Sequence, residues 1–251
     1  MQILFQFLLR LSLGMAGAMV ATSPRQVTSG YYRNNLYVLL GLTVLAGLLA
    51  WTSPADAPLW PPIAAAVLSY LGAVFWLYEL AGPGLLALVA IAGVCLSGTW
   101  LAETSNSAPL TIGWLLARLD PLSGGAVLGT TMAAMLLGHW YLNSPGMSLA
   151  PLVRLTIGLM AAVAARAAVS GAGLALQWHE TGPFSTNQWL FIGLRWLTGI
   201  GGAMAVAVAA RQTLKVPNTQ SATGILYVGV IVTFLGELTA QLLSRQSAFP
   251  L

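Results

Sequence analysis

Four ionisable side chains lie inside apolar stretches that are long enough to cross a bilayer. Arg166 lies in residues 158–176, a run with no other charge, and Arg10, Arg195 and Glu237 occupy similar positions in other apolar stretches. An unpaired cation at mid-depth in a bilayer costs several kcal/mol. We therefore predict that these side chains pair with one another or bind a ligand.

Three guanidinium groups against one carboxylate leave a positive excess. The helical rise places Arg195 and Glu237 on the order of 10 Å below the same membrane surface. Arg10 reaches a comparable depth, and Arg166 lies nearer the middle. On one interpretation an Arg195–Glu237 ion pair fixes helix register, and the other two arginines bond to backbone carbonyls or snorkel to the membrane surface. On the other, the excess charge holds quinone carbonyls, haem propionates, a lipid phosphate or an acidic residue of a partner.

A second group of polar and aromatic residues is predicted at the opposite membrane face. His139, Trp140 and Tyr141 end one apolar stretch, Glu79 ends another, and Arg154 begins a third. Imidazole titrates near neutral pH, so His139 could exchange a proton with a quinol or ligate haem. The alternative is an interfacial aromatic belt in which His139 bonds to a neighbouring carbonyl.

The metal-binding residue types are few and scattered. His139 and His179 lie about one membrane thickness apart and cannot hold one haem between them. A His/Met ligand pair would need one of the eight Met residues, most of which occupy helix-packing positions. The single Cys95 excludes an internal disulfide and a CxxC motif. No metal site, catalytic residue or intrinsic cofactor is predicted, and haem b is less favoured than quinone.

Composition indicates an integral membrane protein. Hydrophobic residues make up 57% of the 251 residues and charged residues only 6%, against roughly 25% charged in an average soluble domain. The net charge of +4 comes from scattered residues with no basic run, so we interpret it as a topology signal and predict no nucleic-acid partner.

The elements that must position the buried charges are predicted to be membrane-spanning helices. Short Pro-, Gly- and Asn-containing segments divide the chain into about eight apolar stretches of roughly 20 residues each. We predict an all-α polytopic helical bundle that forms a single transmembrane domain over residues 1–251. The predicted spans are residues 2–22, 36–53, 59–80, 84–101, 124–142, 152–177, 188–210 and 222–243. Residues 112–120, in the longest loop, are predicted as a short amphipathic helix in the headgroup layer.

Charge in the loops predicts the orientation. Five basic residues fall in the first, fifth and seventh loops, and the other face carries two, together with four acidic residues. The first set is Arg25, Arg33, Arg154, Arg211 and Lys215; the second is Arg118 and Arg245 with Asp56, Glu103, Asp120 and Glu180. Basic loops stay in the cytoplasm, so both termini are predicted on the outer, periplasmic face of a bacterial inner membrane. Residues 1–22 are interpreted as a retained helix because Arg10 interrupts the apolar run.

Two segments resemble a known family. Residues 234–238 read Phe-Leu-Gly-Glu-Leu, and with the eight-helix plan they resemble the Gly-Glu-bearing terminal helix of the membrane-anchor subunits of dimethyl-sulfoxide and polysulfide reductase complexes. Residues 5–14 are similar to the first helix of those anchors. The resemblance implies quinol binding without an intrinsic metal, electron transfer to an iron–sulfur partner, and alignment of Glu237 with the Gly-Glu motif. Residues 138–142 have no counterpart in those anchors.

The leading hypothesis is a multi-pass membrane subunit of a larger respiratory or photosynthetic complex, structural or quinone-handling in role, with lipids and other redox subunits as partners. The chain is too short outside its apolar stretches for a soluble redox domain, which favours a subunit over a stand-alone enzyme. The alternative is a small secondary transporter or channel in which the buried Arg and Glu residues line a substrate path.

Overall fold

The structure is a computed structural model, and it describes residues 1–53, 57–103, 110–144, 146–216 and 218–251. Asp56, one of the residues used to predict orientation, lies outside these ranges. Over the described residues the chain is all-helical, and eight helices are long and apolar enough to cross a membrane. The prediction of an all-α chain with eight helices of this length and hydropathy is therefore confirmed.

Seven spans are single α-helices and one is composite. The first four are α1 (Gln2–Val20), α2 (Ser29–Thr52), α3 (Trp60–Leu77) and α4 (Ala81–Leu101). They are followed by α5 (Ile112–Asn143) and α6 (Ala150–Thr181). The seventh span joins α7 (Thr186–Leu194), the π-helical segment η1 (Arg195–Gly202) and α8 (Ala203–Thr213), and the eighth is α9 (Thr219–Ser244).

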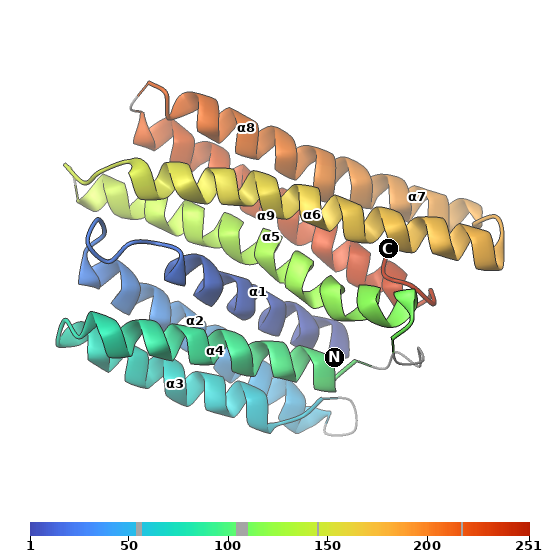
Figure 1. Ribbon diagram of the computed structural model, residues 1–251, viewed down its shortest axis with the longest axis horizontal. Coiled ribbons are helices and arrows are strands. Elements are labelled where there is room, and N and C mark those ends of the chain that lie inside the picture. The colour runs from blue at the N-terminus through green and yellow to red at the C-terminus, as the bar shows by residue number, and fades with distance from the viewer. Residues whose placement is uncertain (54–56, 104–109, 145, 217) are drawn as a thin grey trace.

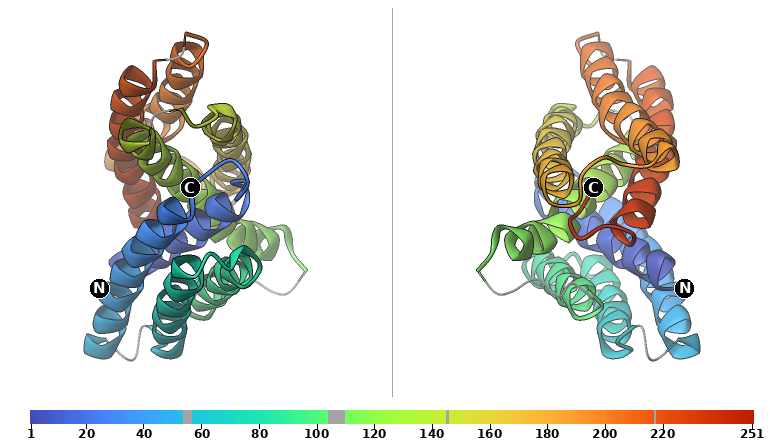
Figure 2. Two further views of the ribbon diagram at one scale, coloured as in Figure 1. Left: turned by 90° about the vertical axis from the view of Figure 1, so that its left-hand side faces the viewer. Right: turned by 90° about the vertical axis from the view of Figure 1, so that its right-hand side faces the viewer.

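The helices form two groups of four. In the first group α1 packs on α2 and α4, and α3 packs on both α2 and α4. In the second group α5 packs on α6 and α9, while α8 lies between α6 and α9. Viewed end-on, one group lies beneath the other, and they meet chiefly where α1 packs on α5 (Figure 2). We call these groups the N-terminal half and the C-terminal half.

Glycines allow α1 and α5 to cross closely. A Cβ atom on Gly14 would lie 1.7 Å from the carbonyl oxygen of Gly125, and one on Gly129 would lie 1.8 Å from the carbonyl carbon of Gly14. Small residues spaced four apart permit such backbone contact between helices in lipid, where packing replaces the hydrophobic drive. The two halves are therefore joined at a glycine crossing.

Both termini lie at one end of the bundle, which we call the termini end (Figure 1). At this end lie the start of α1, the end of α4, the start of α5 and the end of α9.

The short amphipathic helix predicted over residues 112–120 does not form separately. These residues are the first turns of α5, which begins after the N-cap Thr111 and continues through Pro121 to Asn143. Asp120 followed by Pro121 resembles a helix stop in the sequence. In the structure Asp120 is buried and ion-paired to other helices, and those contacts keep α5 inside the bundle.

Candidate functional site

Arg166 is the centre of a buried network of charges. Its Nε and Nη2 donate to the two carboxylate oxygens of Glu237, each at 2.9 Å. Its Nη1 donates to Asp120 Oδ1 at 2.5 Å and to Ser123 Oγ at 3.2 Å. Arg166, Glu237 and Asp120 are at most 4% exposed. One guanidinium therefore links α6 to both α5 and α9.

The network extends by one arginine in each direction. Arg10 Nη1 lies 2.6 Å from Asp120 Oδ2, which joins the N-terminal half to the C-terminal half. Arg195 Nη2 lies 3.4 Å from Glu237 Oε1 and donates to Ser170 Oγ at 2.9 Å. The charges alternate in the order Arg10, Asp120, Arg166, Glu237 and Arg195. We call these five residues the charge chain.

The charge chain is buried and has a net positive charge. The three arginines and two carboxylates are each at most 6% exposed, so with all five ionised the chain carries one positive charge in excess. A bidentate pair with further hydrogen bonds offsets much of the desolvation cost of its charges. The two end members are less well satisfied, since the Nε atoms of Arg10 and Arg195 have no hydrogen-bond partner among the described residues.

Glycines make room for these charged groups. A Cβ on Gly124 would lie 2.6 Å from Glu237 Oε2, and one on Gly199 would lie 2.7 Å from Arg195 Nη1. Gly236 faces Gly199, and a Cβ there would lie 2.1 Å from the Gly199 Cα. Arg195 begins the π-helical segment η1, a geometry often found at functional sites in helices. The Gly-rich sequence of η1 and the Gly236–Glu237 pair therefore serve close packing around the buried carboxylate.

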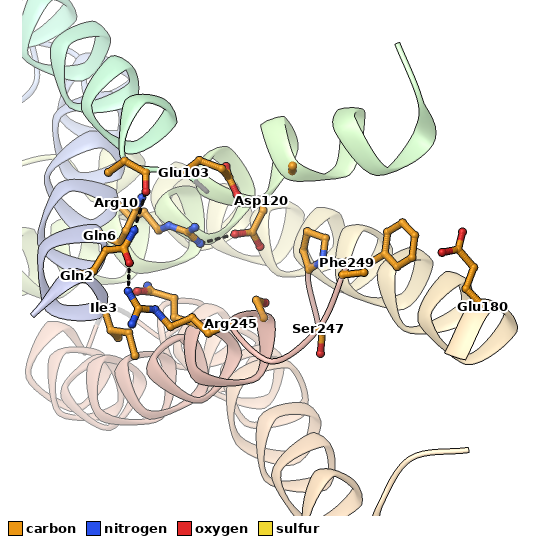
Figure 3. Close-up of a pocket in the computed structure, with 16 residues that line it drawn as sticks. Gln2, Ile3, Gln6, Arg10, Glu103, Asp120, Glu180, Arg245, Ser247 and Phe249 are labelled. Atoms are coloured by element: carbon orange, nitrogen blue, oxygen red, sulfur yellow. Dashed lines mark hydrogen bonds and ion pairs between the residues drawn. The ribbon is translucent and has the colours of Figure 1, made fainter. Parts of the chain in front are cut away.

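A polar cavity of about 790 Å³ adjoins the charge chain at the termini end. Its wall comes from α1, from the residues that follow α4, from α5 and α9, from Glu180 near the end of α6, and from the segment that follows α9 (Figure 3). Arg10 and Asp120 are the two members of the charge chain in this wall. The cavity lies between the N-terminal and C-terminal halves, so a ligand in it would contact both.

Several buried polar atoms of the cavity wall have no hydrogen-bond partner among the described residues. They are Gln6 Oε1, Arg10 Nε and both side-chain polar atoms of Gln241. Such atoms cost free energy unless water or a ligand satisfies them. The set contains donors, from the guanidinium and the amide, and acceptors, from the amide oxygens. The cavity can therefore bind a group that both accepts and donates hydrogen bonds.

Glu103 adds a titratable group to the cavity wall. Its carboxyl is partly buried just beyond the end of α4. Burial and the nearby Asp120 carboxylate raise its pKa to about 7, although Arg10 and Arg118 act in the opposite direction. A carboxyl group with this pKa can accept or release a proton near neutral pH.

Of the two groups of site residues predicted from the sequence, the structure brings together the buried charges and not the polar and aromatic group around His139. Arg10, Arg166, Arg195 and Glu237 all belong to the charge chain.

The second predicted set does not form one site among the described residues. His139 and Glu79 are exposed. Trp140 Nε1 donates to Thr28 Oγ1, Tyr141 Oη donates to the Ser148 carbonyl, and Arg154 donates to Gln26 Oε1. All three bonds run to residues outside the predicted set. Among the described residues, these hydrogen bonds therefore do not join the predicted set to one another.

Four residues of the charge chain and cavity wall are not recognisable as site residues from the sequence: Asp120, Glu103, Gln6 and Gln241. Asp120 was interpreted as a loop charge at the outer face, although an unexplained excess of buried arginine was already a sign that a second carboxylate should lie nearby. The two glutamines have no such signal, because an amide at a helix end is common on protein surfaces.

No protein-family model, curated protein or solved structure shows significant similarity to this chain. Function is therefore inferred from the residues of the site itself. Within the described part of the chain, no three His, Cys, Asp or Glu side chains gather closely enough to hold a metal ion.

Proposed function

We propose that this protein is an integral membrane subunit of a larger redox complex and that it binds the head group of a quinone or quinol in the cavity at the termini end. The observation that carries the proposal is the set of donors and acceptors of Gln6, Arg10 and Gln241 that have no partner in the described part of the chain. A quinone carbonyl accepts hydrogen bonds, and a quinol hydroxyl both donates and accepts them. Both forms can therefore bind to the same wall.

Size and charge support this ligand class. Small-molecule sites commonly measure about 300–1,000 Å³, and this cavity falls within that range. The positive excess of the charge chain reaches the cavity through Arg10. It favours a group with electron-rich oxygens.

We propose partner chains because the sequence has few residues of the types that hold a redox centre. The chain has one Cys and two His, the latter predicted at opposite faces, so we assign the centre that exchanges electrons with the quinol to a partner subunit. Exposed apolar side chains such as Leu48, Leu86 and Leu197 would contact lipid acyl chains. From the loop charges we place the termini end on the periplasmic side of a bacterial inner membrane.

A purification from native membranes tests this function. The protein is isolated in mild detergent, its lipid extract is assayed for quinone, its absorption spectrum is recorded, and co-migrating chains are identified. Saturable binding of a short-chain benzoquinone, together with a co-purifying iron–sulfur or haem subunit, is the expected result. A chain that migrates alone and binds neither the oxidised nor the reduced probe would contradict the proposal.

A second candidate function, transport of a small solute, is favoured by the arrangement of the two halves. They meet at the glycine crossing, and the polar cavity lies between them on the termini side. At the opposite end, hydrogen bonds join residues before or within α2 to α5 and α6. These are Tyr31 to Ala133 at 3.3 Å, Trp140 to Thr28 at 2.9 Å and Arg154 to Gln26 at 3.3 Å.

Such contacts would have to open if the halves rocked to expose the cavity to the other side. Solute flux into liposomes that Arg166→Ala abolishes would select transport over quinol handling. If no solute flux is measured while quinone binding is intact, transport is excluded as the function.

A further inference from the structure

Hydrogen bonds with two other helices fix the end of α4 in place. Gln2 Nε2 donates to the Ala102 carbonyl at 2.8 Å, and Gln6 Nε2 donates to the Thr99 carbonyl at 3.0 Å. Trp100 Nε1 donates to the Arg118 carbonyl of α5 at 3.3 Å. These bonds hold the backbone next to Glu103 against α1 and α5, so the carboxyl is kept in the cavity wall.

The charged groups around Glu103 come from two helices. Arg10 faces it from α1, and Asp120 and Arg118 face it from α5. Arg118 is also engaged elsewhere, because its guanidinium stacks between the rings of Trp100 and Trp114, 5.6 Å from each centroid. The Glu103 carboxyl makes no hydrogen bond or ion pair with the described residues, although its backbone N–H donates to the Trp100 carbonyl at 3.3 Å. The carboxyl is available to a ligand.

Glu103 also lies just beyond the carboxyl end of α4, where the helix dipole places partial negative charge. This disfavours the carboxylate form, as do burial and the Asp120 carboxylate, which together raise the pKa of Glu103 to about 7. The position is suited to a group that alternates between protonated and ionised forms.

From this geometry we infer that Glu103 is the residue that exchanges a proton with the quinol head group in the cavity. The inference rests on the proposed quinol function. When the hydroquinone is oxidised, an O–H bond breaks and the Glu103 carboxylate takes that proton. The second proton passes to water in the open cavity, and the two electrons leave to an iron–sulfur or haem centre of a partner subunit.

The two ligand forms should respond to pH in opposite directions. An ionised Glu103 accepts a hydrogen bond from a quinol hydroxyl, and a protonated Glu103 donates one to a quinone carbonyl. Quinol affinity is therefore expected to rise about tenfold through pH 7, since a hydrogen bond to a charged group is stronger than a neutral one. Quinone affinity is expected to fall across the same window.

The test measures the dissociation constants of decyl-benzoquinone and decyl-benzoquinol for the purified full-length protein between pH 5.5 and 8.5. Glu103→Gln removes the titration and is expected to flatten both profiles while binding of the oxidised form persists. Glu79→Gln, at an exposed position on the opposite end, is the matched control and should keep the wild-type profiles. A thermal unfolding curve of each variant establishes that it is folded.

The outcomes separate this inference from the function on which it rests. If neither form binds the wild-type protein, the quinol function itself fails. If both bind but the wild-type profiles are flat, or if Glu103→Gln keeps the wild-type pH dependence, quinol handling stands and the role of Glu103 is overturned.

Discussion

Arg166 and Glu237 bind each other through two parallel hydrogen bonds of 2.9 Å between α6 and α9. Bidentate pairing of this kind requires a guanidinium, and no lysine could reproduce it. The same arginine also binds Asp120, so it joins the deep carboxylate to the one that borders the cavity. The charge chain thus connects the interior of the C-terminal half with the polar cavity.

Arg166→Met is expected to lower the free energy of unfolding by about 3–5 kcal/mol, the usual cost of leaving buried charges without their partner. Glu237 would lose its two short hydrogen bonds, and Asp120 would keep only Arg10. Thermal unfolding in detergent checks this. A variant that melts with the wild type would show that the carboxylates are satisfied by other means.

Arg195→Met is expected to leave the free energy of unfolding nearly unchanged or to raise it, in contrast to Arg166→Met. Removal of Arg195 leaves two arginines and two carboxylates, so the excess positive charge disappears. It also removes Nε and Nη1 atoms that have no hydrogen-bond partner among the described residues. Replacing poorly satisfied buried charge with an apolar side chain often costs little. A loss as large as that of Arg166→Met would contradict this account.

Gly124→Ala is expected to destabilise the protein by about 1–3 kcal/mol, the usual cost of overpacking. The new Cβ would lie 2.6 Å from Glu237 Oε2 and would push the carboxylate away from Arg166. Gly17→Ala is the control, because a Cβ there has nothing within 4 Å. Equal melting temperatures for the two variants would argue against close packing at Gly124.

Stability is expected to fall as pH rises from about 4.5 to 7 because of Glu103. Its pKa is raised from 4.5 to about 7 in the folded protein. Within this window the unfolded side chain ionises while the folded one stays protonated, so ionisation favours unfolding. The resulting decrease in the free energy of unfolding is absent below pH 4.5 and complete above pH 7. It amounts to at most about 3 kcal/mol, and to about 1–2 kcal/mol after allowance for partial exposure.

Unfolding measured at pH 5 and pH 8 checks the sign. Glu103→Gln should remove this difference and leave the value at pH 5 nearly unchanged. A wild-type protein that becomes more stable between these two pH values, with the same trend in the variant, would show that Glu103 does not control the pH dependence.

The sequence predicted the membrane class and the four buried charges because both follow from hydropathy along a single helix. Arg166 and Glu237 are recognisable as costly wherever their neighbours lie. The pairing was not predictable, because Arg166 and Glu237 are 71 positions apart and helix order along the chain does not give helix packing. One interpretation of the sequence pairs Arg195 with Glu237, and the structure contains that ion pair at 3.4 Å, but Arg166 makes both hydrogen bonds of 2.9 Å.

Asp120 shows the other reason for an incomplete prediction. Its position before Pro121 is typical of a loop, and only contacts from Arg10 and Arg166 make it a buried residue. His139 is the opposite case. Its aromatic neighbours in the sequence suggest a site, but its side chain is exposed. Local sequence fixes the cost of burying a charge, and only tertiary packing decides which charges are buried together.

Binding of decyl-benzoquinone to purified wild-type protein and to Gln241→Leu is the most direct test of the central claim. Gln241 lines the cavity and has no hydrogen-bond partner among the described residues, so its loss removes no such bond from the ligand-free protein. The control is Gln212→Leu, an exposed position near the end of α8. We expect saturable binding that Gln241→Leu weakens about tenfold, the value of one hydrogen bond, and that Gln212→Leu leaves unchanged. The absence of saturable binding, or equal affinity in wild type and Gln241→Leu, would contradict the assignment of the cavity as the quinone site.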